Sequence, residues 1–179
     1  HMILNYADRA REMMASGRSD AERLRFIADN CSALAQRAPA SFAEALQLTW
    51  FCHTAFVMEG RYAMALSRMD QYLYPFYEKD IASGAITRER AVELLENVFM
   101  KIDLNDVVNI CVGGTSPDGK CEVNPLSYCI VEAVKNCNIP GPNLSARIHP
   151  DTPDDFLLEC LKSIGTGLGY PALMNDAVN

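Results

Sequence analysis

The stretch from Ser41 to Gly60 has the clearest pattern of apolar and polar positions in the chain. Ser41 and Glu44 have the spacing of a capping box, in which each side chain accepts a backbone N–H of the first turn. Residues of one face then recur at intervals of three and four, which predicts a helix with a buried side. Glu59-Gly60 ends the pattern. The residues of this face are Phe42, Ala45, Leu46, Thr49, Trp50, His53, Phe56 and Val57.

Helical periodicity recurs in five other segments. Gly17 separates the first two, and Thr87 has the position of an N-cap for the third. A bulky aromatic run, Tyr72 to Tyr77, needs burial in a core larger than one helix provides. The five segments are Ile3 to Ser16, Ser19 to Arg37, Glu89 to Lys101, Leu126 to Cys137 and the residues capped by Thr152-Pro153-Asp154-Asp155.

Three apolar runs bounded by turn residues predict strands at Val107 to Val112, Asn143 to His149 and Pro171 to Val178. Strands that alternate with helices indicate an α/β fold, here a helix-rich chain with a mainly parallel sheet of about three strands. Parallel sheets are normally covered on both faces, and sheet edges are normally protected. We therefore expect a piece of a longer protein, with neighbouring strands in the missing sequence or in another chain.

Length and composition suit one ordinary globular domain, with 179 residues of which 49% are hydrophobic and 22% are charged. The net charge of −7 and the lack of a basic run disfavour nucleic acid as a partner. No apolar run approaches the ~18 residues of a membrane span, so no membrane partner is expected. Seven cysteines without a C-x-x-C pair or a secretory signal indicate free thiols in a reducing cytoplasm. His1-Met2 is interpreted as a remnant of cloning.

One segment comes close to a nucleotide-binding motif. Gly114 to Cys121 differs by one residue from the phosphate loop G-x-x-x-x-G-K-[ST], and it follows a predicted strand. However, Cys121 offers a thiol where Mg²⁺ needs a hard oxygen ligand, and Asp118 would repel phosphate. Ser116 to Gly119 fits a type I surface turn instead. Binding of a nucleotide stays as the alternative function, with Asp176 as its candidate acid on the magnesium side.

Other single features have simpler interpretations. His53 is predicted to be a core histidine, since no second ligand stands beside it at metal spacing, and no metal site is predicted. Cys52 is its sequence neighbour and therefore points to a different side of the helix, which disfavours a nucleophile pair of these two. Gly165 to Gly169 follows a predicted helix and is interpreted as a helix exit rather than a dinucleotide fingerprint.

Five collinear segments resemble the pyruvate formate-lyase domain of the glycyl radical enzymes. This resemblance covers most of residues 39–176 and implies part of a barrel domain at 39–179. The helices predicted from periodicity at 3–38 precede it and fit the family only loosely. The segments are PASFAEALQLTWF from Pro39, SRMDQYLYPFYEKDI from Ser67, NICVGGTSPDGKCEVNPLSYCIVEA from Asn109, PNLSARIH from Pro142 and TGLGYPALMND from Thr166.

The resemblance implies a fold and a chemistry. Family members form a ten-stranded α/β barrel from two five-stranded parallel halves. A cysteine in a G-C-[VI]-E-like loop and a glycine in an R-V-x-G-Y-like loop meet at its centre. An activating enzyme that uses S-adenosylmethionine and an iron–sulfur cluster makes a glycyl radical, which then forms a thiyl radical on the cysteine. The barrel shelters both radicals from solvent. The longer protein is expected to be a cytoplasmic, homodimeric radical lyase, dehydratase or decarboxylase acting on a small organic substrate.

This chain has neither motif, and in the family the cysteine loop follows the segment Asn175-Asp176 within a few dozen residues. No catalytic residue is therefore assigned. The chain is expected to bind no cofactor and to be inactive without the remainder of the barrel and the radical-activating enzyme.

The resemblance also implies sites. Arg61, Tyr62 and Ala63 occupy a stretch that contributes to the substrate pocket in relatives. Tyr62 and Ala63 depart from the His-Ser pair expected of a glycerol or propanediol dehydratase, which disfavours that class. Arg68 and Asp70 are interpreted as structural, pinning the aromatic run, rather than facing the substrate. The full set of motif residues interpreted as structural is Arg68, Asp70, Gln71, Asn124, Asn175 and Asp176.

Overall fold

The structure is a computed structural model, which describes residues 2–17, 20–103 and 107–178. Helices and strands alternate through its second half, so the predicted α/β class is confirmed. The elements in chain order are α1 (Met2–Ala15), α2 (Ala21–Leu34), α3 (Phe42–Met58), β1 (Ala65–Arg68), α4 (Met69–Tyr72), α5 (Tyr74–Ala82), α6 (Arg88–Asp103), β2 (Asn109–Gly113), α7 (Pro125–Cys137), β3 (Asn143–Ile148), α8 (Asp154–Ser163), the π-helical turn η1 (Ile164–Leu168) and β4 (Ala172–Asn175).

The sheet is fully parallel, with the strands in the order β1-β2-β3-β4. It has one strand more than the three that the sequence predicts. The additional strand, β1, has only four residues, and its pairing with β2 is irregular between Ala65 and Ser67. Ser67 has a left-handed backbone, with φ at 56°. A segment so short and irregular does not show the period of two that marks a strand in a sequence.

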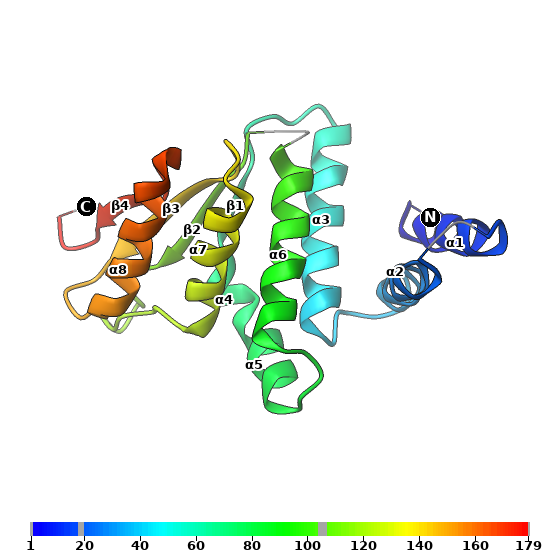
Figure 1. The fold of residues 1–179 in the computed structure, drawn as a ribbon, viewed down its shortest axis with the longest axis horizontal. Coiled ribbons are helices and arrows are strands. Elements are labelled where there is room, and N and C mark those ends of the chain that lie inside the picture. The colour runs from blue at the N-terminus through cyan, green and yellow to red at the C-terminus, as the bar shows by residue number, and fades with distance from the viewer. Residues whose placement is uncertain (1, 18–19, 104–106, 179) are drawn as a thin grey trace.

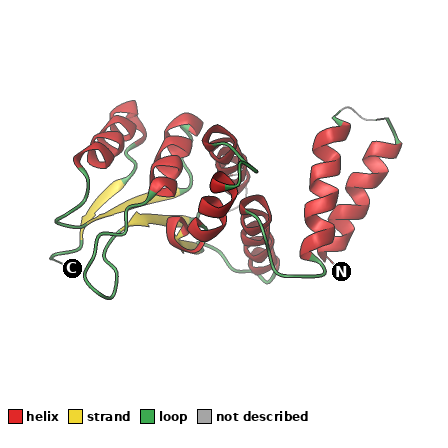
Figure 2. Ribbon diagram, turned by 90° about the horizontal axis from the view of Figure 1, so that it is seen from below, coloured by secondary structure: helices red, strands yellow, loops and turns green. Residues whose placement is uncertain are grey.

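Helices form one row beside the sheet, in the order α8, α7, α6 and α3, with the hairpin of α1 and α2 at the far end (Figure 1). The view from below shows the helices on one side of the sheet (Figure 2). Strand side chains that face the helices, such as Ile110 and Leu144, are buried. Cys111, Ser145 and Arg147, which alternate with them, are only half-buried. Within the described chain the second face of the sheet therefore stays open.

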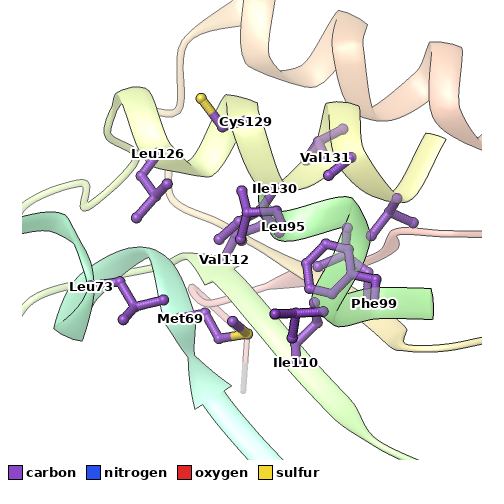
Figure 3. Close-up of a cluster of buried hydrophobic side chains, with 14 of the residues drawn as sticks. Met69, Leu73, Leu95, Phe99, Ile110, Val112, Leu126, Cys129, Ile130 and Val131 are labelled. Carbon is purple, nitrogen blue, oxygen red and sulfur yellow. The ribbon is translucent and has the colours of Figure 1, made fainter. Parts of the chain in front are cut away.

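The core lies between this sheet and the row of helices. Figure 3 shows Leu95 and Phe99 of α6 close to Ile130 of α7 and to Ile110 and Val112 of β2. All five side chains are fully buried. Residues from three elements meet here, so the core joins helices and a strand into one packed body.

Helix α3 separates this core from a smaller one under the α1–α2 hairpin. Its Phe42 and Leu46 belong to the large core, while its Phe51 packs with Ala7 and Cys31 of the hairpin. A helix packed on two sides needs apolar residues around most of its circumference. The predicted buried face is wrong at its end, however, because Phe56 is 51% exposed.

The start of α3 confirms half of the predicted capping box. The Ser41 hydroxyl accepts the Glu44 N–H at 3.2 Å. The Glu44 carboxylate accepts the N–H of Ala40 at 2.7 Å and pairs with Arg37, instead of reaching back to Ser41. The predicted reciprocal bond is therefore wrong, because a cation and an earlier amide take the carboxylate.

The other predicted helices are confirmed as α1, α2, α6, α7 and α8, within a few residues at each end. Thr87 accepts the Arg90 N–H at 3.2 Å, as an N-cap residue does. The glycine segment at 165–169 does form a helix exit, in η1. The aromatic run builds α4 and α5, with Leu73 and Tyr77 buried and Tyr72 42% exposed. His1, Ser19 and Asn179, which lie at the ends of predicted ranges, are outside the described residues.

Candidate functional site

The carboxyl ends of the four strands meet along one edge of the sheet. We call this the carboxyl edge and define it as residues 68–71, 113–115, 148–149 and 175–176. Ligands of open α/β sheets bind outside the carboxyl ends of the strands. Two carboxylates, those of Asp70 and Asp176, organise the hydrogen bonds along this edge.

Asp70 is fully buried and joins three segments. Its Oδ2 accepts the Gly113 N–H at 2.7 Å and the Ser127 hydroxyl at 2.6 Å. Its backbone carbonyl accepts the side-chain amide of Asn124 at 2.9 Å. Burial raises the pKa of Asp70, although the hydrogen bonds from Gly113, Ser127 and Gln71 and the charge of Arg68 act in the opposite direction. The four residues Asp70, Gly113, Asn124 and Ser127, here called the Asp70 cluster, fix the end of β2 to the start of α7.

Asn124 belongs to this cluster because of its place at the start of α7. It is the N-cap, and its side-chain oxygen accepts the N–H groups of Leu126 and Ser127. The Ser127 hydroxyl in turn accepts the Asn124 N–H at 3.0 Å, which completes a capping box. The α7 N-terminus is thus held rigidly against the carboxyl edge.

Arg68 and Gln71 make a second connection to the same segment. Arg68 pairs with the Glu122 carboxylate, and the Gln71 side-chain amide donates to the Glu122 carbonyl at 2.8 Å. The Arg68 side chain thus contacts the β2–α7 connection, as the Asp70 side chain does through Gly113 and Ser127. The predicted role of Arg68 and Asp70 in pinning the aromatic run stays a prediction.

Asp176 directly follows β4 and joins the end of this strand to the ends of β2 and β3. Its Oδ1 accepts Arg147 Nε at 2.8 Å, and its Oδ2 accepts the Thr115 hydroxyl at 3.0 Å. Its N–H donates to the Ile148 carbonyl at 3.0 Å. Burial acts to raise the pKa of Asp176, but the bonds from Arg147 and Thr115 outweigh it and lower the pKa. We call Thr115, Arg147 and Asp176 the Asp176 cluster. Neighbouring Asn175 is exposed and accepts the Ala177 N–H at 2.9 Å.

The predicted pocket residues Arg61, Tyr62 and Ala63 lie elsewhere, in the connection from α3 to β1 (Figure 1). All three are exposed, and Tyr62 is 72% exposed. They precede β1, whereas the carboxyl edge follows it, and a four-residue strand is about 13 Å long. The structure therefore does not bring the two groups of predicted residues together.

The segment that resembles a phosphate loop folds back on itself. Thr115 and Cys121 form an antiparallel bridge, and the Gly119 N–H donates to the Ser116 carbonyl at 2.9 Å, which confirms the predicted turn. Lys120 pairs with Asp118 at 2.5 Å. A phosphate loop needs its lysine directed at phosphate and a helix beginning directly after it. Here α7 begins only at Pro125.

Sequence reasoning missed Thr115, Glu122, Ser127 and Arg147 as members of these clusters. Thr115 and Asp176 are 61 positions apart, and only the parallel register brings their strand ends together. A usable signal existed, because polar residues directly after predicted parallel strands must gather at one edge.

The cysteines show no sign of activation as nucleophiles. All seven are free, and burial raises the pKa of Cys137 to about 11 and that of Cys160 to about 12. His53 is buried, with its ring 5.7 Å from that of Trp50. In the described ranges, no cluster of three His, Cys, Asp or Glu side chains is arranged to hold a metal ion. None of the helices described is both long and apolar enough to cross a membrane.

Comparison with known proteins identifies the family. The sequence matches the family described as pyruvate formate lyase-like over residues 1–179. The chain belongs to this family. Its predicted resemblance to the glycyl radical enzymes is thereby confirmed.

Two curated relatives have names that describe different reactions. The chain is 36% identical to the 4-hydroxyphenylacetate decarboxylase glycyl radical subunit of Clostridium scatologenes, with 96% of this chain and 21% of the relative covered. It is 34% identical to the probable dehydratase YbiW of Escherichia coli K12, with 98% and 25% covered. The chain thus spans about a quarter of the length of these relatives.

Solved structures agree with this assignment. A glycyl radical enzyme from Archaeoglobus fulgidus superposes with a TM-score of 0.90 at 30% identity, covering 98% of this chain and 25% of that one. The glycerol-bound B12-independent glycerol dehydratase of Clostridium butyricum superposes with a TM-score of 0.89 at 37% identity, covering 98% and 24%. The four-stranded parallel sheet and its helices are therefore a portion of the fold of glycyl radical enzymes.

Proposed function

We propose that this chain is a wall segment of a larger glycyl radical enzyme that converts a small organic substrate by radical chemistry. One observation carries the proposal: 98% of the chain superposes on about a quarter of each of two such enzymes, at 30% and 37% identity. The open sheet face and the unpaired outer edges of β1 and β4 in the described chain support it, because parallel sheets are normally covered.

The reactive groups lie outside this chain in our proposal. No cysteine here stands in a Gly-Cys-x-Glu sequence, and Cys31, Cys129 and Cys160 are buried. A thiyl radical must reach a C–H bond of the substrate, which a thiol enclosed in a core cannot do. The chain alone is then inactive, and the longer protein needs an activating enzyme with S-adenosylmethionine and an iron–sulfur cluster. A homodimer in the cytoplasm belongs to the same proposal.

Arg61, Tyr62 and Ala63 line the substrate pocket of the longer protein in this proposal. Ala63 has a left-handed backbone with φ at 59°, which alanine rarely adopts. Such conformations gather at functional sites, where the surroundings hold them in place. The Tyr62 side chain is exposed here and free to contact other parts of a barrel. The absence of a His-Ser pair favours a decarboxylase, or a dehydratase of a substrate other than a simple diol.

The test uses the longer protein that carries this segment, activated without oxygen. Turnover is measured with 4-hydroxyphenylacetate, trans-4-hydroxy-L-proline and glycerol, because these compounds appear in the names of relatives. For the substrate that is consumed, Tyr62→Phe should lower kcat/KM by roughly threefold to tenfold, the effect of one lost hydrogen bond. Tyr6→Phe is the matched control, because Tyr6 is also exposed, at 46%, but lies on α1.

Two results would count against the proposal. Turnover by residues 1–179 alone would place the chemistry inside this chain. Equal kinetics of Tyr62→Phe and Tyr6→Phe would remove Tyr62 from the pocket, while leaving the family chemistry in place.

A further inference from the structure

Strand β4 is held in an unusual way for the last strand of a sheet. All four of its residues are exposed, including Leu173 at 45% and Met174 at 44%. It pairs with β3 on one side only, within the described chain. Its side chains therefore contribute little apolar burial, and the hydrogen bonds at its end must do much to hold β4 in place.

The Asp176 cluster supplies these bonds. A single carboxylate, with its side chain 6% exposed, binds Arg147 of β3 and Thr115 after β2. Because a guanidinium donates to a carboxylate, the Arg147–Asp176 pair is a charge-assisted bond, and such bonds are shorter and stronger than neutral ones. The Asp176 N–H adds a bond to the Ile148 carbonyl. The direction in which the chain leaves β4 is thus set by three contacts to two other strands.

Gly114 leaves the space that this cluster needs. A Cβ built on Gly114 would lie 3.3 Å from Arg147 Nε and 3.3 Å from Asp176 Oδ2. Its φ of 101° is also one that residues with a side chain rarely adopt. Gly113 approaches even closer, since its Cβ would lie 2.9 Å from the Arg147 carbonyl oxygen. The two glycines and the three polar residues therefore form one fitted arrangement.

We propose that Asp176 is a positioning residue, which fixes the exit of the chain from β4 and so places the segment that follows it for hydrogen-atom transfer. This inference rests on the proposed function and on the family resemblance, which implies that the reactive cysteine follows Asn175-Asp176 within a few dozen residues. Placement matters because displacing a reacting group by about 1 Å can lower a rate by roughly 100-fold. Arg147 and Thr115 act through Asp176.

The reaction that reports on placement needs no substrate. In D2O the cysteine carries S–D. The glycyl radical takes the deuterium atom, so that a C–D bond forms, the S–D bond breaks and the unpaired electron moves to sulfur. The reverse transfer takes the hydrogen atom from the same carbon and leaves a deuterated glycyl radical. The loss of the EPR splitting from the glycyl Cα hydrogen therefore measures the rate of transfer between glycine and thiol.

The experiment uses the activated longer protein in D2O. Asp176→Asn should form the glycyl radical in normal yield, but the splitting should disappear roughly 100-fold more slowly. Thr115→Val should slow the loss by roughly threefold to tenfold, as expected for one neutral hydrogen bond. Thr115→Ser keeps the hydroxyl and should restore the normal rate. Asp151→Asn is the matched control and should not change the rate, because the Asp151 side chain is 84% exposed and its partner at 3.7 Å, His149, is not a member of the Asp176 cluster.

The outcomes separate this inference from the proposed function. Absence of a glycyl radical in the unmodified protein would end the proposed function and this inference with it. A radical that exchanges at the normal rate in Asp176→Asn would overturn the positioning role alone. The positioning role would also be overturned if the backbone amides of residues 172–178 exchanged faster in Asp176→Asn while the glycyl radical exchanged its hydrogen no more slowly. If Asp176→Asn does not fold, equal rates for Thr115→Val and Thr115→Ser would overturn it.

Discussion

Asp70 and Asp176 lie at the same edge of the same sheet, and each carboxylate ties together segments that are distant in the sequence. Asp70 is fully buried, and its side chain accepts bonds from an amide and a hydroxyl. Asp176 has a guanidinium as its partner, and it follows a strand whose side chains are exposed. Burial raises the pKa of the first, while the charged and polar donors lower the pKa of the second.

The difference indicates that the two aspartates have different roles. Losing a buried acceptor leaves its donors without partners in the core, so Asp70 should matter most for stability. Asp176 holds a strand that adds little to the core, so its loss should alter the local geometry more than the stability of the whole. Three experiments can break or sharpen this contrast.

The largest expected effect follows from Asp70→Ala. This change leaves the Gly113 N–H and the Ser127 hydroxyl without their acceptor, and each buried unpaired group costs about 1–3 kcal/mol. We expect the free energy of opening around β2 and α7 to fall by about 2–5 kcal/mol. Hydrogen exchange of peptides from residues 109–115 and 124–130 in the longer protein measures this free energy of opening.

Asp155→Ala is the control for this experiment. Its exposed carboxylate accepts the Tyr128 hydroxyl and the Phe156 N–H, each at 2.8 Å, and the loss of these solvent-exposed bonds should cost about 1 kcal/mol. If Asp70→Ala opened no more readily than Asp155→Ala, Asp70 would not be the support that the contrast requires.

Gly114→Ala should have the second largest effect. Its new Cβ would press on the side chains of Arg147 and Asp176 in addition to adopting a left-handed backbone. We expect about 2–3 kcal/mol of local destabilisation, against about 1 kcal/mol for Gly84→Ala. Gly84 is a matched control, because its φ is 72° and nothing lies within 4 Å of its Cβ position. Equal exchange rates near the mutated sites would show that Asp176 does not need this space.

The smallest effect is the response to pH, and its sign differs between the two carboxylates. The lowered pKa of Asp176 means that its contribution is complete above the ordinary value of 3.8 and is lost as the pH falls through the lowered pKa. The raised pKa of Asp70 means that its contribution is complete below 3.8 and is lost as the pH rises through the raised pKa.

Asparagine variants make this difference measurable from about pH 3 to about pH 7. The advantage of the unmodified protein over Asp176→Asn should shrink as the pH falls. Its advantage over Asp70→Asn should shrink as the pH rises. Opening free energies from hydrogen exchange, corrected for intrinsic rates, provide the comparison. Parallel pH profiles for the two variants would contradict the assignment of opposite shifts.

Much of the fold could be predicted, because the helices have local signals. The caps at Ser41 and Thr87 and the apolar periodicity behind them indicate α3 and α6 directly. β1 escaped prediction, because four irregular residues have no period to detect. The carboxyl-edge clusters depend on register between distant segments, so the sequence indicated Asp70 and Asp176 through family resemblance but not their partners Ser127, Arg147 and Thr115.

The proposal that this chain is a wall of a radical enzyme has one most direct test. The longer protein and residues 1–179 alone are each treated without oxygen with the activating enzyme, S-adenosylmethionine and a reductant, and EPR spectra are recorded. We predict a glycyl radical doublet in the longer protein and no organic radical in the chain alone. A doublet in the chain alone, or none in the longer protein beside an activated relative as positive control, would contradict the proposal.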